Sequence, residues 1–311
     1  MGGAGAAPSG AAAPRDRICR RGRTARYRGA RGSASGEASD DGGDPGLPAA
    51  RARILRRAAL GVFTRLLVGL DGSPRADAAF EQAVVLAQRF GSTVVVAYVR
   101  ERNGHAANGA AMLDRARERL ATAGLQAELA EREGEPDVEL AELAKAADAV
   151  LVGRRGVTTK GGALGPTVGS LIRIAERCVI VCGGLPSPMT SCALAFDGRE
   201  TSQRALELAV RFATVVGSTI HLIHAASDRD AGLQVVGVAE ALLSMQRVPF
   251  VTHVEPGTPG EVVARVIKRT RCDALFAGAH LSHEHGRPSA VVVSHAEEIL
   301  RHTDIPVVIQ P

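Results

Sequence analysis

Aromatic side chains are scarce in this sequence, which has no Trp, two Tyr and seven Phe among 311 residues. Since hydrophobic residues still make up 45% of the chain, we expect an aliphatic core. Long hydrophobic runs are also missing. The run from Ala58 to Leu70 is interrupted by Arg65, far short of the roughly 18 to 20 residues of a spanning helix. A membrane protein is therefore not predicted, and the charged fraction of 23% is typical of a globular chain rather than a disordered or collagenous one.

Lysine is scarce, and the excess of basic charge is concentrated at the N-terminus. Residues 1–60 hold twelve Arg, no Lys and five acidic residues, whereas the remainder holds 26 basic and 28 acidic residues. Nucleic-acid binding is therefore not predicted for the rest of the chain. Residues 1–61 lack hydrophobic periodicity, so we expect a disordered Arg/Gly/Ala-rich leader: a dispensable extension, a basic arm for phosphate backbones, or a targeting segment, the last disfavoured by Asp40, Asp41 and Asp44.

The five cysteines form neither a CxxC pair nor an even framework, which indicates a reduced, cytoplasmic protein. Cys178 and Cys182 lie four apart in the apolar run RCVIVC, where alternation places both on one face of a strand. We interpret them as buried structural thiols rather than as a metal or redox pair.

An internal repeat organises the chain. The segment beginning at Leu66 matches the segment beginning at Cys192 without gaps at an offset of 126, and Asp71 aligns with Asp197. Identities at this offset include Gly72, Ala79, Glu81, Ala83, Val84, Ala87, Gly91, Ser92 and Thr93. So many identities in one register indicate a duplication.

Strand-like and helix-like segments alternate in each copy. In the first copy, strands are expected at 66–70, 93–99, 125–130, 149–152 and 179–182, and helices at 74–90, 112–123, 137–146 and 170–177, with Ser73 capping the helix that Pro74 opens. This alternation predicts an α/β fold with parallel strands and helices on both faces. We expect two doubly wound domains in tandem, at residues 62–183 and 191–311, joined by a linker at 184–190.

Glycines gather after the fourth strand in the stretch LVGRRGVTTKGGALGPTVGS. Gly153 and Gly156 follow the strand, and Gly169-Ser170 is expected to open the next helix. Ligands of open α/β sheets bind beyond the carboxyl ends of strands, where glycines let backbone N–H groups approach phosphates. Ordinary loop glycines explain such a pattern about as well, but Asp71 at the end of the first strand favours a nucleotide site.

At these residues the chain resembles the universal stress protein family in tandem form. The family pattern G-x2-G-x9-G-[S/T] is matched by Gly153, Gly156 and Gly169-Ser170, although twelve residues rather than nine separate the second and third glycines. The resemblance implies five-stranded parallel sheets of the adenine nucleotide alpha hydrolase-like (HUP) type and a stress-response role. It implies ATP as the ligand, which Mg²⁺ could accompany. The residues it implicates are Asp71 and Tyr98 beside adenine or ribose, and Val152, Gly153, Gly156, Gly169, Ser170 and Leu171 along the ribose and phosphates.

The second copy keeps only part of this pattern. Asp197 and Gly278 are present, but the second glycine position reads Leu281 and the helix-opening pair reads Val293-Ser294. A Cβ at these points blocks the close approach of backbone to phosphate. We therefore expect one nucleotide site, in the first repeat, and a degenerate second repeat.

No catalytic constellation is visible. The chain contains neither a GxxxxGK[ST] phosphate loop nor a GxSxG nucleophile elbow, so at most weak ATP hydrolysis is expected. Arg154, Arg155 and Lys160 could offset phosphate charge or be solvated loop charges. His280, His283 and His285 form an H-x2-H-x-H pattern that could bind Zn²⁺ or Ni²⁺, sense protons or contact a partner, but a polar loop without ligand is the preferred interpretation, and no tightly bound metal is predicted.

The fifth strands, at 179–182 and 306–309, are apolar edge candidates. In the resembling family such edges form dimers, so we expect a homodimer or an intramolecular pseudo-dimer of the two repeats. Two functions follow as hypotheses: ATP binding that alters conformation or partner binding, and a nucleotide-free interaction scaffold or dimerisation module whose long loop no longer fits phosphates. A hydrolase or flavin-binding relative would need a catalytic set that the sequence lacks.

Overall fold

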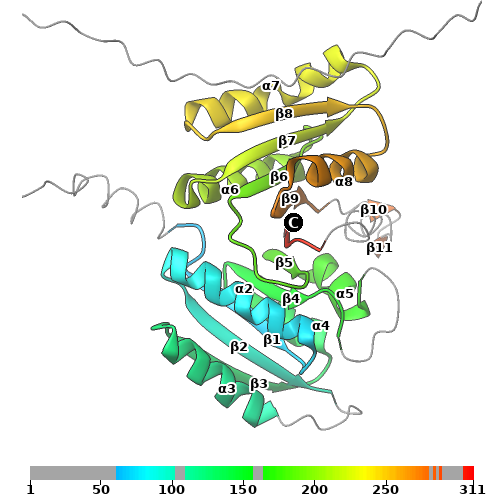
Figure 1. The fold of residues 1–311 in the computed structure, drawn as a ribbon. Coiled ribbons are helices and arrows are strands. Elements are labelled where there is room, and N and C mark those ends of the chain that lie inside the picture. The colour runs from blue at the N-terminus through cyan, green and yellow to red at the C-terminus, as the bar shows by residue number, and fades with distance from the viewer. Residues whose placement is uncertain (1–60, 102–108, 157–163, 280–282, 285–286, 289–303) are drawn as a thin grey trace, which may run out of the picture.

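The computed structural model describes residues 61–101, 109–156, 164–279, 283–284, 287–288 and 304–311 (Figure 1). Strands and helices alternate through the first repeat as the sequence predicts. Its elements are β1 (Arg65–Leu70), α2 (Pro74–Phe90), β2 (Thr93–Arg100), α3 (Gly109–Thr122), β3 (Ala127–Glu133), α4 (Pro136–Ala144), β4 (Ala149–Gly153), α5 (Pro166–Ile174) and β5 (Cys178–Cys182). The predicted leader falls almost wholly in residues 1–60, outside the described residues.

The second repeat follows the same plan. Its elements are β6 (Ser191–Ala195), α6 (Glu200–Val216), β7 (Thr219–Ala225), α7 (Arg229–Met245), β8 (Phe250–Glu255), α8 (Pro259–Thr270), β9 (Ala274–Gly278) and β12 (Val307–Gln310). The short strands β10 (His283–Glu284) and β11 (Arg287–Pro288) pair antiparallel with each other. Within the described ranges, no helix is both long and apolar enough to cross a membrane.

All ten longer strands form one sheet, in the order β3-β2-β1-β4-β5-β12-β9-β6-β7-β8. Strands are parallel within each repeat, and the order in the second repeat is the reverse of that in the first. The repeats meet where β5 and β12 pair antiparallel, with Val307 opposite Val181. The fifth strands therefore cover each other's edges within one chain, in the manner of a pseudo-dimer (Figure 1).

Local sequence explains how the elements begin and end. Ser73 accepts a hydrogen bond from the backbone N–H of Ala76 at 3.1 Å, and Pro74 occupies the first turn of α2, as predicted. The helix ends at Gly91, whose φ of 69° is the left-handed conformation that glycine adopts readily.

A carboxylate fixes the start of the first strand in both repeats. Asp148 accepts hydrogen bonds from the backbone N–H groups of Thr64 and Arg65, at 2.6 and 2.9 Å. Asp273 does the same for Thr190 and Ser191, at 3.0 and 2.9 Å. The duplication thus extends beyond the matched segments to a shared side-chain contact before β4 and β9.

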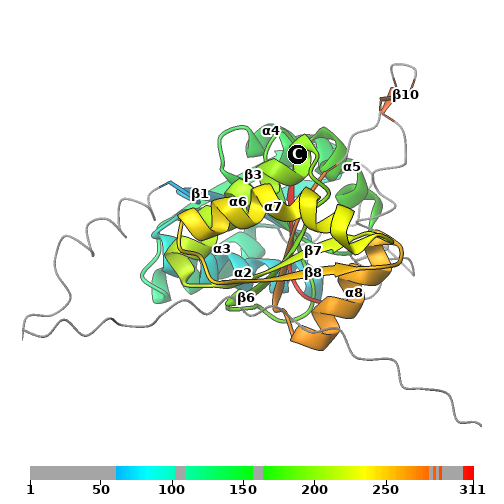
Figure 2. The same cartoon turned by 90° about the horizontal axis from the view of Figure 1, so that it is seen from above.

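The hydrophobic core is divided by the faces of the sheet rather than by the repeats. One cluster lies under α2, α3, α6 and α7, and the other under α4, α5 and α8, and each contains residues of both repeats. Figure 2 shows α7 and α8 on opposite sides of β7 and β8. The core is largely aliphatic, as expected, but Phe63, Phe90, Phe212 and Phe276 form a chain of ring contacts with centroids 5.3 to 6.4 Å apart. This aromatic cluster joins the two repeats.

Buried polar contacts hold the segment between β5 and β6. The Gln82 side chain on α2 donates to the carbonyl oxygen of Ser187 at 3.1 Å and accepts from its N–H at 2.7 Å. The Ser187 hydroxyl in turn donates to the carbonyl oxygen of Asp273 at 2.6 Å. The connecting segment is therefore fixed to both repeats rather than being a free tether.

Cys178 and Cys182 are buried on one face of β5, as predicted. Burial raises the pKa of the Cys178 thiol to about 12 and raises that of Cys182 as well. Thiols with such pKa values are not thiolates near neutral pH, which agrees with a structural role.

Candidate functional site

The candidate site lies at the carboxyl ends of β1 and β4, where α2 and α5 begin. Asp71 follows β1 in an exposed turn, and its Oδ1 accepts a hydrogen bond from the N–H of Ser73 at 2.9 Å. Gly72 has a φ of 81°, which favours glycine at that turn. The turn therefore presents the Asp71 carboxylate at the edge of the sheet, where open α/β folds bind ligands.

Gly156 lies directly beside this carboxylate. A Cβ built at Gly156 would be 2.7 Å from Oδ2 of Asp71. The fold thus brings together two residues of the predicted site that are 85 positions apart in the sequence. A side chain at this position would push the exposed carboxylate aside.

Gly153 has a different surrounding. A Cβ built at Gly153 would lie 2.6 Å from the carbonyl oxygen of Arg75 and 2.7 Å from the backbone nitrogen of Ala76. The end of β4 therefore passes very close to the first turn of α2. Gly278 makes the same approach to α6, 2.7 Å from the nitrogen of Ser202. Retention of this glycine in both repeats is explained by helix packing, and a ligand contact by Gly153 stays a prediction.

The expected start of the helix after the glycines was wrong. α5 begins at Pro166, with Gly165 before it, so Gly169 lies inside the helix and its N–H donates to the carbonyl oxygen of Gly165 at 3.0 Å. Proline at the first helical position, which needs no N–H partner, accounts for the earlier start. The Gly169 N–H is therefore engaged within α5, while Ser170 is half-buried and Leu171 is buried.

Tyr98 and Val152, two further residues of the predicted set, belong to the core. Tyr98 is 5% exposed, and its ring fills the space where a Cβ on Gly109 would stand, at the start of α3. Val152 is equally buried, in the centre of the sheet. Contact of either with a ligand would therefore be confined to a small exposed edge or to the backbone, and these roles stay predictions.

Two arginines of the first repeat, Arg75 and Arg154, meet at one aspartate of the second repeat. Nη1 of Arg154 lies 3.5 Å from Oδ1 of Asp304, and Nη1 of Arg75 lies 3.4 Å from the same oxygen. Burial lowers the pKa of Arg154, the nearby Asp304 opposes that shift, and the charges of Arg75 and Arg155 add to it. Lys160, the other cation expected near phosphates, lies outside the described residues.

The equivalent corner of the second repeat is only partly described. Asp197 makes the same turn as Asp71, accepting from the N–H of Arg199 at 3.0 Å, and Gly198 has a φ of 81°. Leu281 and Val293-Ser294, which the sequence identifies as departures from the glycine pattern, lie outside the described residues.

The histidine loop gives no described metal site. His280 and His285 lie outside the described residues, and His283 belongs to β10. Where the chain is described, no group of three or more His, Cys, Asp or Glu side chains could hold a metal ion.

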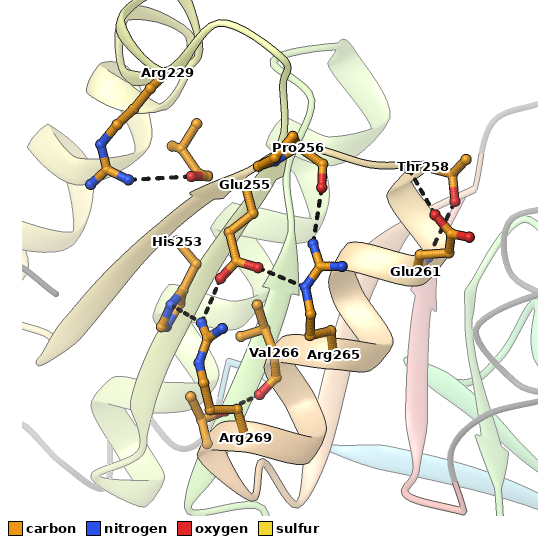
Figure 3. A network of polar contacts seen from close by, with 11 residues as sticks. Arg229, His253, Glu255, Pro256, Thr258, Glu261, Arg265, Val266 and Arg269 are labelled. Atoms are coloured by element: carbon orange, nitrogen blue, oxygen red, sulfur yellow. Dashed lines mark hydrogen bonds and ion pairs between the residues drawn. The ribbon is translucent and has the colours of Figure 1, made fainter. Parts of the chain in front are cut away.

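A different histidine cluster, His221 with His253, lies in the second repeat and was missed by sequence reasoning. Figure 3 shows His253 with the neighbouring Arg269, Glu255 and Arg265. Nδ1 of His221 is 3.1 Å from Nε2 of His253, whose Nδ1 is 3.1 Å from a nitrogen of Arg269. Arg269 and Arg265 both bind the carboxylate of Glu255, at 2.6 and 2.9 Å. The available signal was the placement of histidines on neighbouring strands, but their pairing required the register of β7 and β8.

Since Arg269 can only donate, His253 accepts at Nδ1 and must carry its proton on Nε2, which donates to His221. Both imidazoles of this chain of hydrogen bonds are therefore neutral. Burial alone would raise the pKa of Glu255, but hydrogen bonds and charges from Arg269 and Arg265 outweigh burial and lower it.

Comparison with known proteins agrees with this architecture. Over 165 residues the chain is 25% identical to Universal stress protein Slr1230 of Synechocystis sp. (strain ATCC 27184 / PCC 6803 / Kazusa), a match covering 51% of this chain and 56% of that protein. The chain thus spans little more than half the length of this curated relative. A universal stress protein from Archaeoglobus fulgidus DSM 4304 has a similar fold, with a TM-score of 0.68 at 19% identity, covering 79% of this chain and 95% of that one.

The functionally unknown protein PA1789 from Pseudomonas aeruginosa PAO1 has a TM-score of 0.61 at 14% identity, covering 81% of this chain and 94% of that one. At these identities the two structures show the fold alone. The Universal stress protein family itself matches twice, over residues 63–183 and 189–311. The chain therefore belongs to the Universal stress protein family, with two of its α/β domains in tandem.

Proposed function

We propose that the first repeat binds an adenine nucleotide, with ATP as the first choice, and that occupancy alters conformation or partner binding in a stress response. The observation that carries the proposal is the adjacency of Asp71 and Gly156, since a Cβ at Gly156 would lie 2.7 Å from the carboxylate. A carboxylate beside bare backbone at the carboxyl edge of a parallel sheet suits a nucleoside and its phosphates.

The chemistry of the corner fits such a ligand. Asp71 is exposed and could accept hydrogen bonds from ribose hydroxyls or the adenine amino group. Arg75, Arg154 and Arg155 supply positive charge for the phosphates, with which Mg²⁺ could be bound. We propose binding rather than catalysis, since the sequence has neither a P-loop nor a nucleophile elbow.

A cytoplasmic location is part of the proposal. It is supported by Cys178, Cys182, Cys192 and Cys272, which are free and buried rather than paired. Chains in oxidising compartments more often use cysteine in disulfides.

The proposal is tested by denaturing the purified protein, identifying released nucleotide by mass spectrometry, and titrating the emptied protein with ATP in a calorimeter. Asp71→Ala should abolish or strongly weaken ATP binding. Asp197→Ala is its matched control, because Asp197 makes the same turn in the second repeat with an equivalent hydrogen bond. A protein that releases no nucleotide and has no affinity for ATP would contradict the proposal and favour the interaction scaffold.

A further inference from the structure

Asp304 of the second repeat reaches into the candidate site of the first. Eleven ion pairs are found among the described residues, and the two that join the repeats, from Arg75 and Arg154, both end on Oδ1 of Asp304. The backbone is held there as well, since a Cβ on Gly183 would overlap the carbonyl oxygen of Asp304. The position of the carboxylate therefore follows from the antiparallel pairing of β5 with β12.

The two sides of this contact differ in burial. The Arg154 side chain is 6% exposed, whereas that of Asp304 is 69% exposed. A guanidinium held away from water interacts strongly with a nearby anion, and an exposed carboxylate loses little when it turns into solvent. Another anion can therefore replace Asp304 without first rearranging the arginine.

The arginines belong to the same segments as the proposed nucleotide site. Arg154 lies between Gly153 and Gly156, and its carbonyl oxygen accepts a hydrogen bond from the N–H of Gly165, just before α5, at 2.9 Å. Arg75 is in the first turn of α2, whose backbone touches Gly153. The backbones of both arginines therefore belong to the segments that carry Asp71 and Gly156, and their guanidinium groups meet at Asp304.

The described part of the second repeat lacks this pair of arginines. Thr201 stands at the position of Arg75 in the repeat alignment. Ala279 stands at the position of Arg154, since it follows Gly278 as Arg154 follows Gly153. The backbone is equivalent, because Thr201 packs on Gly278 as Arg75 packs on Gly153, and Ala279 donates to Gln310 as Arg154 donates to Cys182. At these two described positions the second repeat has no arginine side chain to bind an anion.

We propose that Asp304 is a specificity-determining residue that occupies Arg75 and Arg154 in the nucleotide-free protein and is displaced by the phosphates of a nucleoside polyphosphate. Displacement makes binding depend on the phosphate chain more than on the nucleoside. It also links occupancy of the first repeat to the segment that leads into β12. This inference rests on the proposed adenine-nucleotide site for the nucleoside part, but its phosphate part is testable alone.

The experiment compares the full-length wild type with Asp304→Asn, using calorimetry with ATP, AMP, adenosine and inorganic tripolyphosphate. Removing the competing carboxylate should tighten ATP and tripolyphosphate binding by about three- to tenfold and leave adenosine unchanged. Glu142→Gln is the matched control, since it removes the same charge from an ion-paired side chain that is 68% exposed, and it should change nothing. When Arg75→Gln is also present, Asp304→Asn should increase the affinity for ATP and tripolyphosphate by a smaller factor.

The outcomes separate the two proposals. If ATP binds but Asp304→Asn binds it no more tightly than the wild type, the inference is wrong and the proposed function stands. If tripolyphosphate responds to Asp304→Asn while neither ATP nor adenosine shows any contribution from the nucleoside, the proposed function is wrong and the inference stands. If no probe binds any variant, both are wrong.

Discussion

Glycines of similar appearance in the sequence have different roles in the structure. Gly153 and Gly278 allow a strand to pass close to a helix backbone, and Gly156 makes room for the Asp71 carboxylate. Gly169 is not crowded, since the nearest atom to a Cβ there would be Nη1 of Arg173 at 3.9 Å. The pattern of glycines was readable from the sequence, but packing glycines and ligand glycines could not be distinguished before the helices were in place.

These surroundings predict opposite effects of alanine. Gly153→Ala and Gly278→Ala should each lower the free energy of unfolding by about 2 kcal/mol or more, because the new Cβ meets backbone that cannot move freely. Gly169→Ala should leave it unchanged or raise it by up to about 1 kcal/mol, since alanine favours the helix interior. Urea denaturation measures all three, and equal effects at Gly153 and Gly169 would contradict the packing assignment.

Side-chain contacts between distant residues were the part of the site that sequence reasoning missed. Asp304 is 229 positions from Arg75, and no local pattern connects them. Their contact depends on β12 lying beside β5, which in turn depends on how the two repeats face each other. By contrast, Asp71 was identified correctly as the residue at the end of the first strand, because a strand run followed by a Gly-containing turn is a local signal.

The elements themselves were mostly predictable, and the errors have local causes. Strands and helices were found because apolar residues recur at the appropriate periods. The predicted start of α5 at Ser170 is wrong because Gly165-Pro166 opens the helix, and Gly169 lies about one turn inside it. β3 was placed too early, since it is an exposed edge strand with a mostly polar sequence.

Asp148, whose carboxylate accepts hydrogen bonds from the backbone of Thr64 and Arg65 and is called here the carboxylate clamp, should make stability depend on pH. Burial alone would raise the pKa of Asp148, but hydrogen bonds from Thr64 and Arg65 outweigh burial and lower it. A lowered pKa means that the clamp stabilises the fold above the ordinary Asp value of about 3.9 and that this contribution is lost as the pH falls through the lowered value.

Asp148→Asn should therefore cost about 1 kcal/mol at pH 7, the typical net value of such hydrogen bonds at an exposed site. The difference from wild type should shrink as the pH falls below the ordinary Asp value of about 3.9. Chemical denaturation at several pH values provides the measurement, and a difference that is constant from pH 7 to pH 2 would contradict the clamp.

The histidine pair gives a second pH dependence at higher pH. His253 is buried and accepts from Arg269, so a proton added at Nδ1 would break that hydrogen bond and face a cation. The unfolded chain takes up such protons near pH 6.5, so the unfolded state binds more protons and stability should fall as the pH falls from about 7 to 5.

In a double variant, His221→Asn with His253→Asn, stability should depend much less on pH between 7 and 5. The variant should remain folded at pH 7.5. Thermal unfolding at pH 7.5 and 5.5 compares the two proteins, with His224→Asn as the control on the same strand. Equal slopes in wild type and double variant would show that the pair does not couple protonation to stability.

At the scale of the whole molecule, the two repeats are packed into one continuous structure. They share a ten-stranded sheet, two core layers and an aromatic cluster. The duplication predicted two similar domains, but their shared core could not be derived from the sequence, because each repeat alone satisfies the α/β pattern. The division of the core by sheet face follows only from the pairing of β5 with β12.

Disturbing the contact between β5 and the segment before β12 should lower the stability of the whole molecule. Gly183→Ala places a Cβ onto the carbonyl oxygen of Asp304, whereas Gly184→Ala meets only Nη1 of Arg75 at 3.6 Å. We expect Gly183→Ala to lower the free energy of unfolding by about 2 kcal/mol or more, or to split unfolding into two transitions, and Gly184→Ala to have little effect. Calorimetric scans distinguish these outcomes, and identical scans for both variants would contradict a tight contact between the repeats.

We propose that the two similar repeats carry one nucleotide site per chain. Native mass spectrometry of the full chain with ATP counts bound nucleotides directly. We predict one ATP per chain in the wild type and in Asp197→Ala, and none in Asp71→Ala. Two ATP per chain, or one that survives Asp71→Ala and is lost in Asp197→Ala, would contradict the claim.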